Sequence, residues 1–372
     1  MEPRQRTMKK DIAPNLNHNS RLPISLGCIQ CPERNLCGGL QVYGDHYDCL
    51  VFCDCPDRSM CSLACPNNLK IYLERHQEVR GFTLENIPRV PGFPVCDLPA
   101  SLPVIYHASK RITKVDVDAV AIPLSYLFNR KTGALRFRGR KELADHFRFN
   151  EAARVVIMGV GQDEPIEDYW ALRRTASIPE RLATLQPDLI TVPNFSLPLD
   201  VVRYDNMHNI KRIAICWSEL MLAGIPTALH LNARTDRDWE RWIEFILERD
   251  EVRSVSFEFA TGPARPNWGK WYVTKLISLA AAVPRRLQLI TRGGYPYLNE
   301  LRKVFSEVVF VDTTSFMKTV YRKRVIWGSK NEIRWIDSKT GNFETLDELL
   351  EHNLTNYRSI ILDGDRSIVR RV

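Results

Sequence analysis

Eight short apolar runs, separated by longer amphipathic segments, dominate the sequence after residue 103. They lie at 104–107, 119–124, 154–160, 188–192, 227–232, 254–259, 287–291 and 308–312. Several are rich in β-branched residues and apolar at successive positions, as are strands that are buried on both faces of a parallel sheet. Eight such strands with intervening helices predict an α/β fold, a (β/α)8 TIM-like barrel.

The connection between the first two runs, residues 108–118, is too short to hold a full crossover helix. An open doubly wound sheet is therefore the alternative fold, although no Gly-x-Gly-x-x-Gly turn supports a dinucleotide-binding version of it. The clearest predicted helix spans residues 235–249. Thr235 and Asp238 form a capping box at its start, and Trp239 and Trp242 begin its apolar face.

The sequence predicts five segments around this barrel. They are a flexible arm (1–22), a cysteine-rich metal-binding module (23–68), a connector (69–102), the barrel (103–327) and a C-terminal hairpin and helix (328–372). The connector is expected to hold one short helix and then an extended, proline-rich stretch. In the last segment, a turn at 337–341 is expected to follow strand 333–336 and to precede a helix at 346–353.

Eight of the ten cysteines lie between residues 28 and 65. The N-terminus has no apolar signal core, so a secreted disulfide framework is not expected, and metal ligation is the remaining common reason for this density. The predicted ligands are Cys28, Cys31, Cys37, Cys49, Cys53, Cys55, Cys61 and Cys65.

The spacing of these cysteines suits two four-cysteine sites. Cys28 and Cys31 form a Cys-x-x-Cys knuckle, Cys37 is followed by two glycines that allow a tight turn, and Cys49 is the expected fourth ligand. The other four thiolates form the second site. The Cys53-x-Cys55 spacing favours two zinc ions, whereas Cys65-Pro66 is typical of iron–sulfur ligand runs, so a [4Fe-4S] cluster is the alternative cofactor.

The formal net charge of +8 raises the expectation of a polyanionic partner, namely DNA or RNA. No run of 18 apolar residues is present, so a soluble, cytoplasmic protein with no membrane partner is expected. The local concentrations of positive charge are Lys318, Arg322, Lys323 and Arg324, and then Arg366, Arg370 and Arg371.

In a barrel of this kind, the carboxyl ends of the strands and the loops after them carry the active site. This rule, applied from the second strand onward, gives the candidate residues Ser125, Tyr126, Gly159, Gln162, Asn194, Ser196, His230, Asn232, Glu258, Arg292, Gly293, Gly294 and Asp312.

Asp312 and Glu258 are the predicted catalytic residues. A carboxylate at position 312 can attack or stabilise an electron-poor sugar carbon, with Glu258 as the partner acid or base. The alternative for Asp312 is the N-cap of a helix that starts at Thr313, and both roles can coexist. Gly293 and Gly294 can present backbone amides to a phosphate, but a plain turn is the simpler interpretation.

Two segments resemble strands of the tRNA-guanine transglycosylase superfamily, which includes DNA-directed deazaguanine-inserting relatives. Leu185-Gln-Pro-Asp-Leu-Ile-Thr-Val-Pro-Asn194 resembles the strand that ends in a base-recognising aspartate. Val311-Asp312-Thr-Thr-Ser-Phe316 resembles the strand that ends in the nucleophilic aspartate. The resemblance, over about residues 103–327, implies that Asp312 is the nucleophile and that Asn194 faces the base. The family's second-strand aspartate and glycines are replaced here by Leu124-Ser-Tyr126.

The predicted function is that of a nucleic-acid base glycosylase or transglycosylase, which acts at an N-glycosidic bond through a carboxylate nucleophile. The substrate-binding residues would be Tyr126, Asn194, Ser196, His230, Asn232, Arg292, Gly293 and Gly294. Two alternatives remain: an iron–sulfur redox enzyme on a barrel scaffold, and a non-catalytic nucleic-acid-binding subunit.

Elemental analysis of anaerobically purified protein, with a visible absorbance spectrum, tests the metal module. We expect two zinc ions per chain and no colour, because the cysteine spacing favours two closed tetrahedral sites. Iron with acid-labile sulfide and a broad visible absorbance would contradict the zinc prediction and favour the redox enzyme.

Overall fold

The computed structural model describes residues 69–108, 110–197, 203–260, 268–328, 333–338 and 345–362, with Leu36 and two short strands before them. These strands, β1 (Gln41–Val42) and β2 (Asp45–His46), pair antiparallel. The eight clustered cysteines lie outside the described residues, so the metal module stays a prediction.

The chain divides into two compact units. The first consists of Met1–Thr83, Leu197–His208 and Ala233–Arg241, and the second of Leu84–Ser196, Asn209–Asn232 and Trp242–Val372.

Within the first unit, helix α3 (Leu69–Glu78) is fixed by charged contacts to the start of a later helix. The Nε of Arg75 lies 2.7 Å from a carboxylate oxygen of Asp205. At the end of α3, the carboxylate of Glu78 lies 2.7 Å from Nε2 of His208, whose side chain is 2% exposed.

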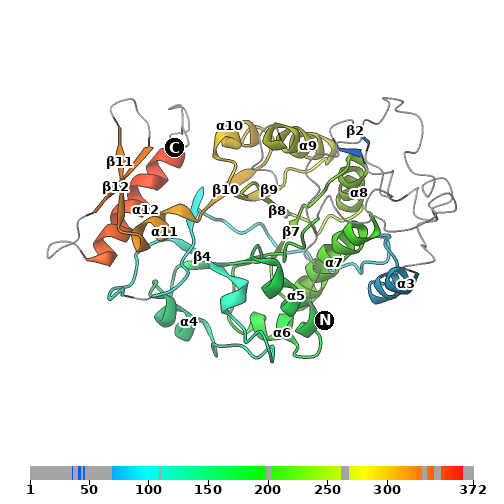
Figure 1. The fold of residues 1–372 in the computed structure, drawn as a ribbon, viewed down its shortest axis with the longest axis horizontal. Coiled ribbons are helices and arrows are strands. Elements are labelled where there is room, and N and C mark those ends of the chain that lie inside the picture. The colour runs from blue at the N-terminus through cyan, green and yellow to red at the C-terminus, as the bar shows by residue number, and fades with distance from the viewer. Residues whose placement is uncertain are drawn as a thin grey trace, which may run out of the picture. The chain divides into compact units, whose positions relative to one another are not determined.

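The second unit is built on eight strands that are all parallel to their neighbours (Figure 1). They are β3 (Ser101–Pro103), β4 (Ala119–Pro123), β5 (Arg154–Met158), β6 (Leu189–Thr191), β7 (Thr227–His230), β8 (Ser254–Glu258), β9 (Gln288–Arg292) and β10 (Glu307–Asp312). Neighbours follow sequence order, and β10 pairs with β3. The amide of Ile105 donates to the carbonyl of Ala121, which links β3 to β4 and nearly closes the ring. The predicted TIM-like barrel is confirmed.

Helices connect the later strands, as the alternating pattern predicts. They are η2 (Leu124–Tyr126), α4 (Arg140–Phe147), α5 (Asp163–Leu172), α6 (Ile178–Ala183), α7 (Arg203–Leu222), α8 (Asp236–Leu247), α9 (Trp268–Ala282), η4 (Tyr295–Tyr297) and α10 (Leu298–Leu301). Helix α11 (Thr314–Val320) follows the last strand of the barrel. The predicted capping box starts α8: the amide of Asp238 donates to Oγ1 of Thr235 at 3.1 Å, and the amide of Thr235 donates to Oδ2 of Asp238 at 3.1 Å.

None of the described residues between β3 and β4 is helical, and the C-terminal helix α12 (Leu346–Leu362) packs beside β3. Asp347, in the first turn of α12, fixes this segment. Its Oδ1 lies 3.2 Å from the Nε of the buried Arg111, and its Oδ2 accepts the amides of Ile112 at 2.6 Å and Thr113 at 3.1 Å. A helix from the end of the chain therefore lies beside the first strand, which lacks a crossover helix.

A hairpin of β11 (Lys323–Trp327) and β12 (Ile333–Asp337) precedes α12. The sequence predicts a turn after the second of these strands, at 337–341. In the structure, residues 333–337 pair instead with the segment before them, and Val325 lies opposite Trp335. This pairing places Val325 and Trp335 on one face of the hairpin and Ile326 and Ile336 on the other.

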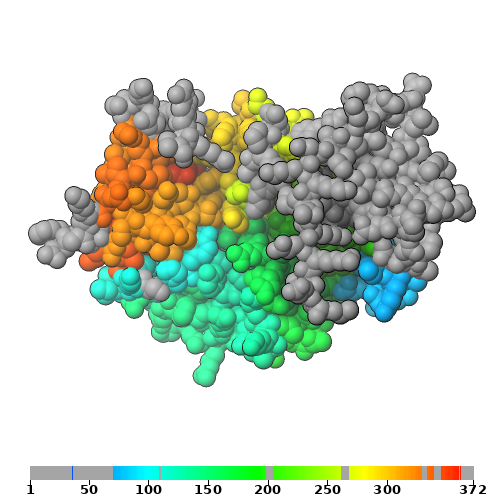
Figure 2. Space-filling model, in the orientation of Figure 1, coloured from blue at the N-terminus to red at the C-terminus, as the bar shows by residue number. Residues whose placement is uncertain are grey.

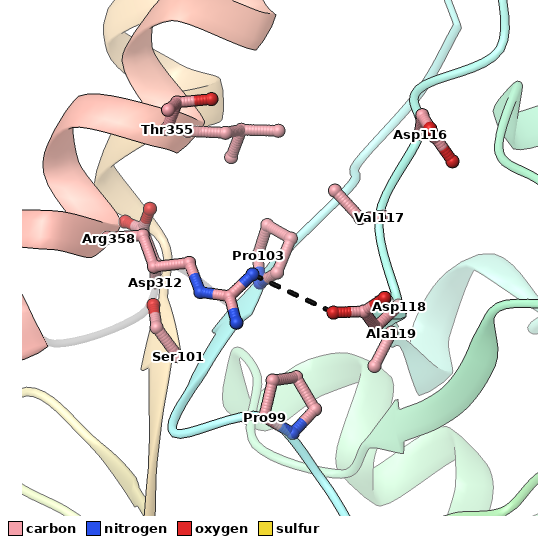
Figure 3. A pocket seen from close by; sticks show the side chains of 11 residues that line it. Pro99, Ser101, Pro103, Asp116, Val117, Asp118, Ala119, Asp312, Thr355 and Arg358 are labelled. Carbon is pink, nitrogen blue, oxygen red and sulfur yellow. Dashed lines mark ion pairs between the residues drawn. The ribbon is translucent and has the colours of Figure 1, made fainter.

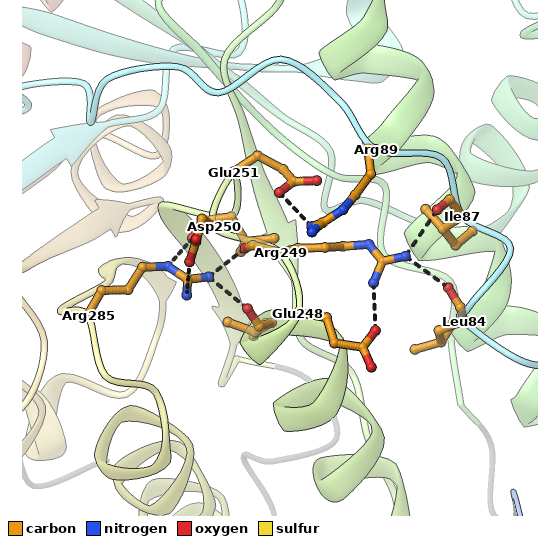
Figure 4. A network of polar contacts seen from close by, with 10 residues as sticks. Leu84, Ile87, Arg89, Glu248, Arg249, Asp250, Glu251 and Arg285 are labelled. Carbon is orange, nitrogen blue, oxygen red and sulfur yellow. Dashed lines mark hydrogen bonds and ion pairs between the residues drawn. The ribbon is translucent and has the colours of Figure 1, made fainter.

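Residues 87–98 of the connector contact the amino-terminal end of the barrel. Leu98 belongs to the apolar cluster inside the ring, and Gln288 at the start of β9 donates to the carbonyl of Cys96 at 2.7 Å. Arg249 donates to the carbonyl of Ile87 at 3.0 Å, and Arg89 pairs with Glu251 at 3.0 Å (Figure 4).

Replacement of Asp347 by alanine tests the attachment of α12. The substitution leaves the guanidinium of Arg111, whose side chain is 1% exposed, without its carboxylate. We expect the free energy of unfolding to fall by about 3 kcal/mol, measured by urea denaturation. Asp145→Ala is the matched control, because Asp145 pairs with Lys114 and Lys141 at the surface and its loss should change stability little. Equal effects of the two substitutions would contradict this role for Asp347.

Candidate active site at the barrel mouth

Strand register brings three of the predicted side chains together inside the barrel. Ile290 of β9 belongs to the interior cluster, so the two-residue period of a strand also directs Arg292 inward. Glu258 lies opposite Arg292 in the register of β8 and β9, and His230 lies opposite Ser256 in the register of β7 and β8. These side chains therefore face the same interior at the carboxyl ends of their strands.

Glu258 is the buried carboxyl of this group, with only 3% of the residue exposed. Its Oε1 accepts the amide of Ala260 at 2.6 Å, and its Oε2 lies 3.2 Å from Nη1 of Arg292. Burial raises the pKa of Glu258 from 4.5 to about 7, because the loss of water outweighs the opposing effects of Arg292 and the Ala260 amide. A carboxyl with this pKa can both give and accept a proton near neutral pH.

Two polar atoms of the Glu258–Arg292 pair have no hydrogen-bond partner among the described residues. They are Oε2 of Glu258, despite its charge contact with Nη1, and the buried Nε of Arg292. Buried polar atoms are normally hydrogen-bonded, so unpaired atoms at a barrel mouth indicate a place where a polar group of a ligand can bind.

His230 is a neutral partner in this interior. It is 1% exposed, and its Nδ1 lies 3.2 Å from Oγ of Ser256. Burial lowers the pKa of His230 to about 3, so the imidazole carries no charge at neutral pH. It can contribute a hydrogen bond, but not a positive charge, to the mouth.

Two tyrosines lie together at the mouth. The rings of Tyr106 and Tyr126 meet edge to face with centroids 6.4 Å apart, and Phe316 lies 5.6 Å from the Tyr106 ring. Tyr126 is 39% exposed, whereas burial raises the pKa of Tyr106. Tyr106 is not among the sequence candidates, because the strand-end rule was applied only from the second strand onward. The sequence signal that could have identified it is spacing: Tyr106 follows the interior residues Leu102 and Val104 at the two-residue period of a strand, so its side chain points to the same side.

Asn194, Ser196 and Asn232 tie loops together near the ends of β6 and β7. The side-chain amide nitrogen of Asn232 donates to Oδ1 of Asn194 at 2.9 Å and to the carbonyl of Phe195 at 2.8 Å. Oγ of Ser196 donates to a carboxylate oxygen of Asp163 at 2.5 Å. These contacts give each side chain a structural role, and their predicted substrate contacts stay predictions.

Gly293 and Gly294 are required by the turn after β9. Their φ angles are +74° and +75°, and a Cβ on Gly294 would lie 2.5 Å from the ring of Phe259. The helices that follow, η4 and α10, have three and four residues, too short to form a helix-terminal phosphate site. The structure therefore favours the plain turn over a phosphate site.

Asp312 caps helix α11. Its Oδ1 accepts the amides of Thr314 at 2.7 Å and Ser315 at 3.0 Å, which is the predicted N-cap role. The residue is 3% exposed, and burial raises its pKa against the opposing effect of these hydrogen bonds.

Strand alternation separates Asp312 from the interior group. Val311 belongs to the interior cluster, so the next side chain leaves β10 on the outer side. There it lines a cavity of about 170 Å³ between the barrel wall and α12 (Figure 3). Ser101 and Pro103 of β3 also line this cavity, as does Arg358 of α12, which lies 3.8 Å from Asp118. The nucleophilic role of Asp312 stays a prediction, and Glu258 is the carboxyl that the register places inside the mouth.

No group of three or more His, Cys, Asp or Glu side chains suited to a metal ion occurs among the residues that the structure describes. The two cysteines outside the predicted module, Cys96 and Cys216, are free thiols. Burial raises the pKa of Cys96 to about 11. Within the same described ranges, no helix is both long enough and apolar enough to cross a membrane.

No family model and no curated protein matches this sequence. Among solved structures, a protein from Anabaena variabilis described as a sugar phosphate isomerase/epimerase is similar in fold, at 12% identity and a TM-score of 0.30, over 57% of this chain and 77% of the other. A protein from Burkholderia cenocepacia described as a phosphonomutase is similar at 16% identity and a TM-score of 0.31, over 60% and 92% of the two chains. These similarities concern the barrel fold alone.

The raised pKa of Glu258 predicts a dependence of stability on pH. The folded protein keeps a proton that the unfolded chain loses above its pKa of 4.5, so the free energy of unfolding falls as the pH rises from 4.5 through about 7. The full effect of this group is about 3 kcal/mol. Urea denaturation of the wild type and of Glu258→Gln across this range should show a decline in the wild type that the variant lacks. Parallel pH profiles would contradict the raised pKa.

Proposed function

We propose that this chain is an enzyme that releases or exchanges a base at an N-glycosidic bond of a nucleic acid, with Glu258 as its acid–base group. The observation that carries the proposal is a carboxyl of pKa about 7 that pairs with an arginine inside the barrel mouth. The net charge of +8 and the two tyrosines at the mouth support a nucleic-acid substrate.

In the proposed reaction, protonated Glu258 donates its proton to a nitrogen or oxygen of the departing base while the C1′–N bond breaks. The bonding electrons leave with the base, and positive charge develops on the sugar. The Glu258 carboxylate then takes a proton from the water, or from the incoming base, that bonds to C1′. The proton given up in the first half is thus regained in the second, and Glu258 ends in its starting state.

Arg292 and the tyrosines position the reacting groups in this scheme. The guanidinium of Arg292 holds one oxygen of Glu258 and lowers its pKa from the value that burial alone would give. Both forms of the carboxyl are then available near neutral pH. A base turned out of its stack can rest against Tyr126, which is partly exposed beside Tyr106.

The roles of Asp312 and of the cysteine module in this reaction stay predictions. Asp312 would be the nucleophile if the reaction passes through a covalent sugar–enzyme intermediate, as the transglycosylase resemblance implies. The cysteine module, which lies outside the described residues, would grip the polymer with its two zinc ions, and an iron–sulfur cluster there would instead favour redox chemistry.

A non-catalytic nucleic-acid-binding subunit is the second candidate. It is favoured by the structural contacts of several predicted site residues, since Asp312 caps a helix and Asn232 ties two loops together. In that case the barrel would be a scaffold, and binding to nucleic acid would occur without turnover.

Paired amide substitutions test the proposal, with release of free bases from DNA and tRNA measured by chromatography. We expect Glu258→Gln to lose at least about 100-fold in rate, because glutamine cannot transfer the proton. Wild-type activity should also decline as the pH rises above about 7, where Glu258 loses its proton. Asp312→Asn should keep most of the activity, because asparagine also accepts the two amide hydrogen bonds that start α11.

Binding of the same nucleic acids is the control, and both variants should bind as the wild type does. If Asp312→Asn is inactive and Glu258→Gln is active, Asp312 and not Glu258 is the catalytic carboxyl. Salt-dependent binding by the wild type with no base release from any substrate would favour the non-catalytic subunit.

A further inference from the structure

The end of α11 and the hairpin before α12 together carry a large share of the positive charge of this chain. Residues 318–338 contain six Lys or Arg and two Asp or Glu, a net charge of +4 out of a formal +8 for the whole chain. None of these residues belongs to the candidate active site. The concentration of charge therefore calls for a separate explanation.

The hairpin has two different faces. Val325 and Trp335 lie opposite each other on one face, where Val325 is 1% exposed and the ring of Trp335 lies 5.7 Å from that of Tyr357 on α12. The other face, here called the outer face, carries two cross-strand pairs that each join an arginine to an isoleucine. They are Arg324 with Ile336, and Ile326 with Arg334.

Apolar and aromatic groups remain exposed around these cations. Ile336 is 43% exposed on the outer face. Tyr321, just before the hairpin, is 66% exposed. Trp327, at the end of β11, is 40% exposed but lies on the opposite face, with Val325. The segment lies at the molecular surface, where it is drawn in orange (Figure 2). Exposed rings interspersed with cations are the combination that binds the bases and phosphates of single strands.

The hairpin is held rigidly on α12, which favours a binding role. Asn353, fully buried, accepts the amide of Val325 at 2.9 Å and donates to the carbonyl of Lys323 at 2.8 Å. His352 lies 3.0 Å from the carbonyl of Val325, and its Nδ1 accepts a hydrogen bond from Arg324 at 2.8 Å. A surface that is already ordered loses less conformational entropy on binding.

We infer that the outer face of the hairpin, with the neighbouring Tyr321, binds a single-stranded segment of nucleic acid. The side chain of Arg334 would contact a phosphate, and the exposed ring of Tyr321 would stack on an unpaired base. The inference rests on the proposed function for the class of partner, and it adds the surface that holds the strand outside the barrel mouth. A surface for duplex DNA would need no exposed rings, since paired bases are already stacked.

Fluorescence anisotropy with a labelled single-stranded oligonucleotide tests this surface on the full chain. We expect Arg334→Gln to weaken binding severalfold, because glutamine cannot neutralise a phosphate. The slope of log Kd against log salt, between about 50 and 200 mM, should fall by about 0.7 for each phosphate that the variant leaves unneutralised. Tyr321→Ala should weaken binding about tenfold with little change in the salt slope, because stacking releases no counterions.

Arg138→Gln is the matched control, because Arg138 is an exposed arginine before α4 and away from the hairpin. It should bind as the wild type does, and equal urea midpoints would show that all three variants are folded. Wild-type affinity and salt slope in both hairpin variants would overturn the inference. So would weaker binding of these variants to anionic phospholipid vesicles with unchanged oligonucleotide binding, since the partner would then be a membrane surface.

The same variants separate this inference from the proposed function. Hairpin variants that lose binding, in a protein that releases no base, would leave the binding surface standing and remove the enzyme. If the protein releases bases and the hairpin variants bind nucleic acid normally, the enzyme stands and the binding surface on the hairpin is removed.

Discussion

The hydrogen bond from Ile105 to Ala121 joins the first strand of the barrel to the second, although none of the described residues between them is helical. Once the eight strands form a ring, the two-residue period of each strand decides which side chains lie inside. It places Glu258 and Arg292 in the mouth and directs Asp312 to the outer wall. Because none of the described residues between β3 and β4 is helical, no crossover helix covers β3, and the C-terminal helix α12 packs beside it.

Removal from water then sets the chemistry of the interior. Glu258 and His230 are almost equally buried, and burial shifts both toward the uncharged form. For His230 no charge opposes the effect of burial, so its pKa falls to about 3. The imidazole is therefore a much weaker base than an ordinary histidine. For Glu258 the charge of Arg292 partly opposes burial, and the pKa stops at about 7. Arg292, with the hydrogen bond from the Ala260 amide, therefore keeps the pKa of this carboxyl lower than burial alone would.

The barrel itself was predictable from the sequence, because eight buried parallel strands leave eight apolar runs of the right spacing. The capping box of α8 was also predictable from the sequence, because Thr235 and Asp238 are only three positions apart. The partner of residues 333–337 was not, because the turn expected at 337–341 placed it after that strand, whereas the structure pairs the strand with residues 323–327. The position of α12 beside β3 depends on contacts more than 230 residues apart in the sequence.

The candidate site was partly predictable, in a way that strand geometry explains. Glu258 and Arg292 follow from the strand-end rule, but the rule does not say which side of the sheet a final residue faces. Asp312 shows this limit, since it ends its strand as Glu258 does and yet lies one position out of phase with the interior. Tyr106 shows the opposite case, because it lies past the end of β3 and remains in phase with the interior positions of that strand.

The most direct test of this account is an infrared titration of the Glu258 carboxyl. The difference spectrum between the wild type and Glu258→Gln isolates the C=O stretch of the protonated acid, which can be followed from about pH 4 to 9. The account predicts a titration midpoint near 7 that moves upward in Arg292→Gln, because the arginine opposes the effect of burial. A midpoint near the ordinary value of 4.5 would mean that Glu258 is fully ionised at neutral pH, and would contradict its role as the acid–base group of the barrel mouth.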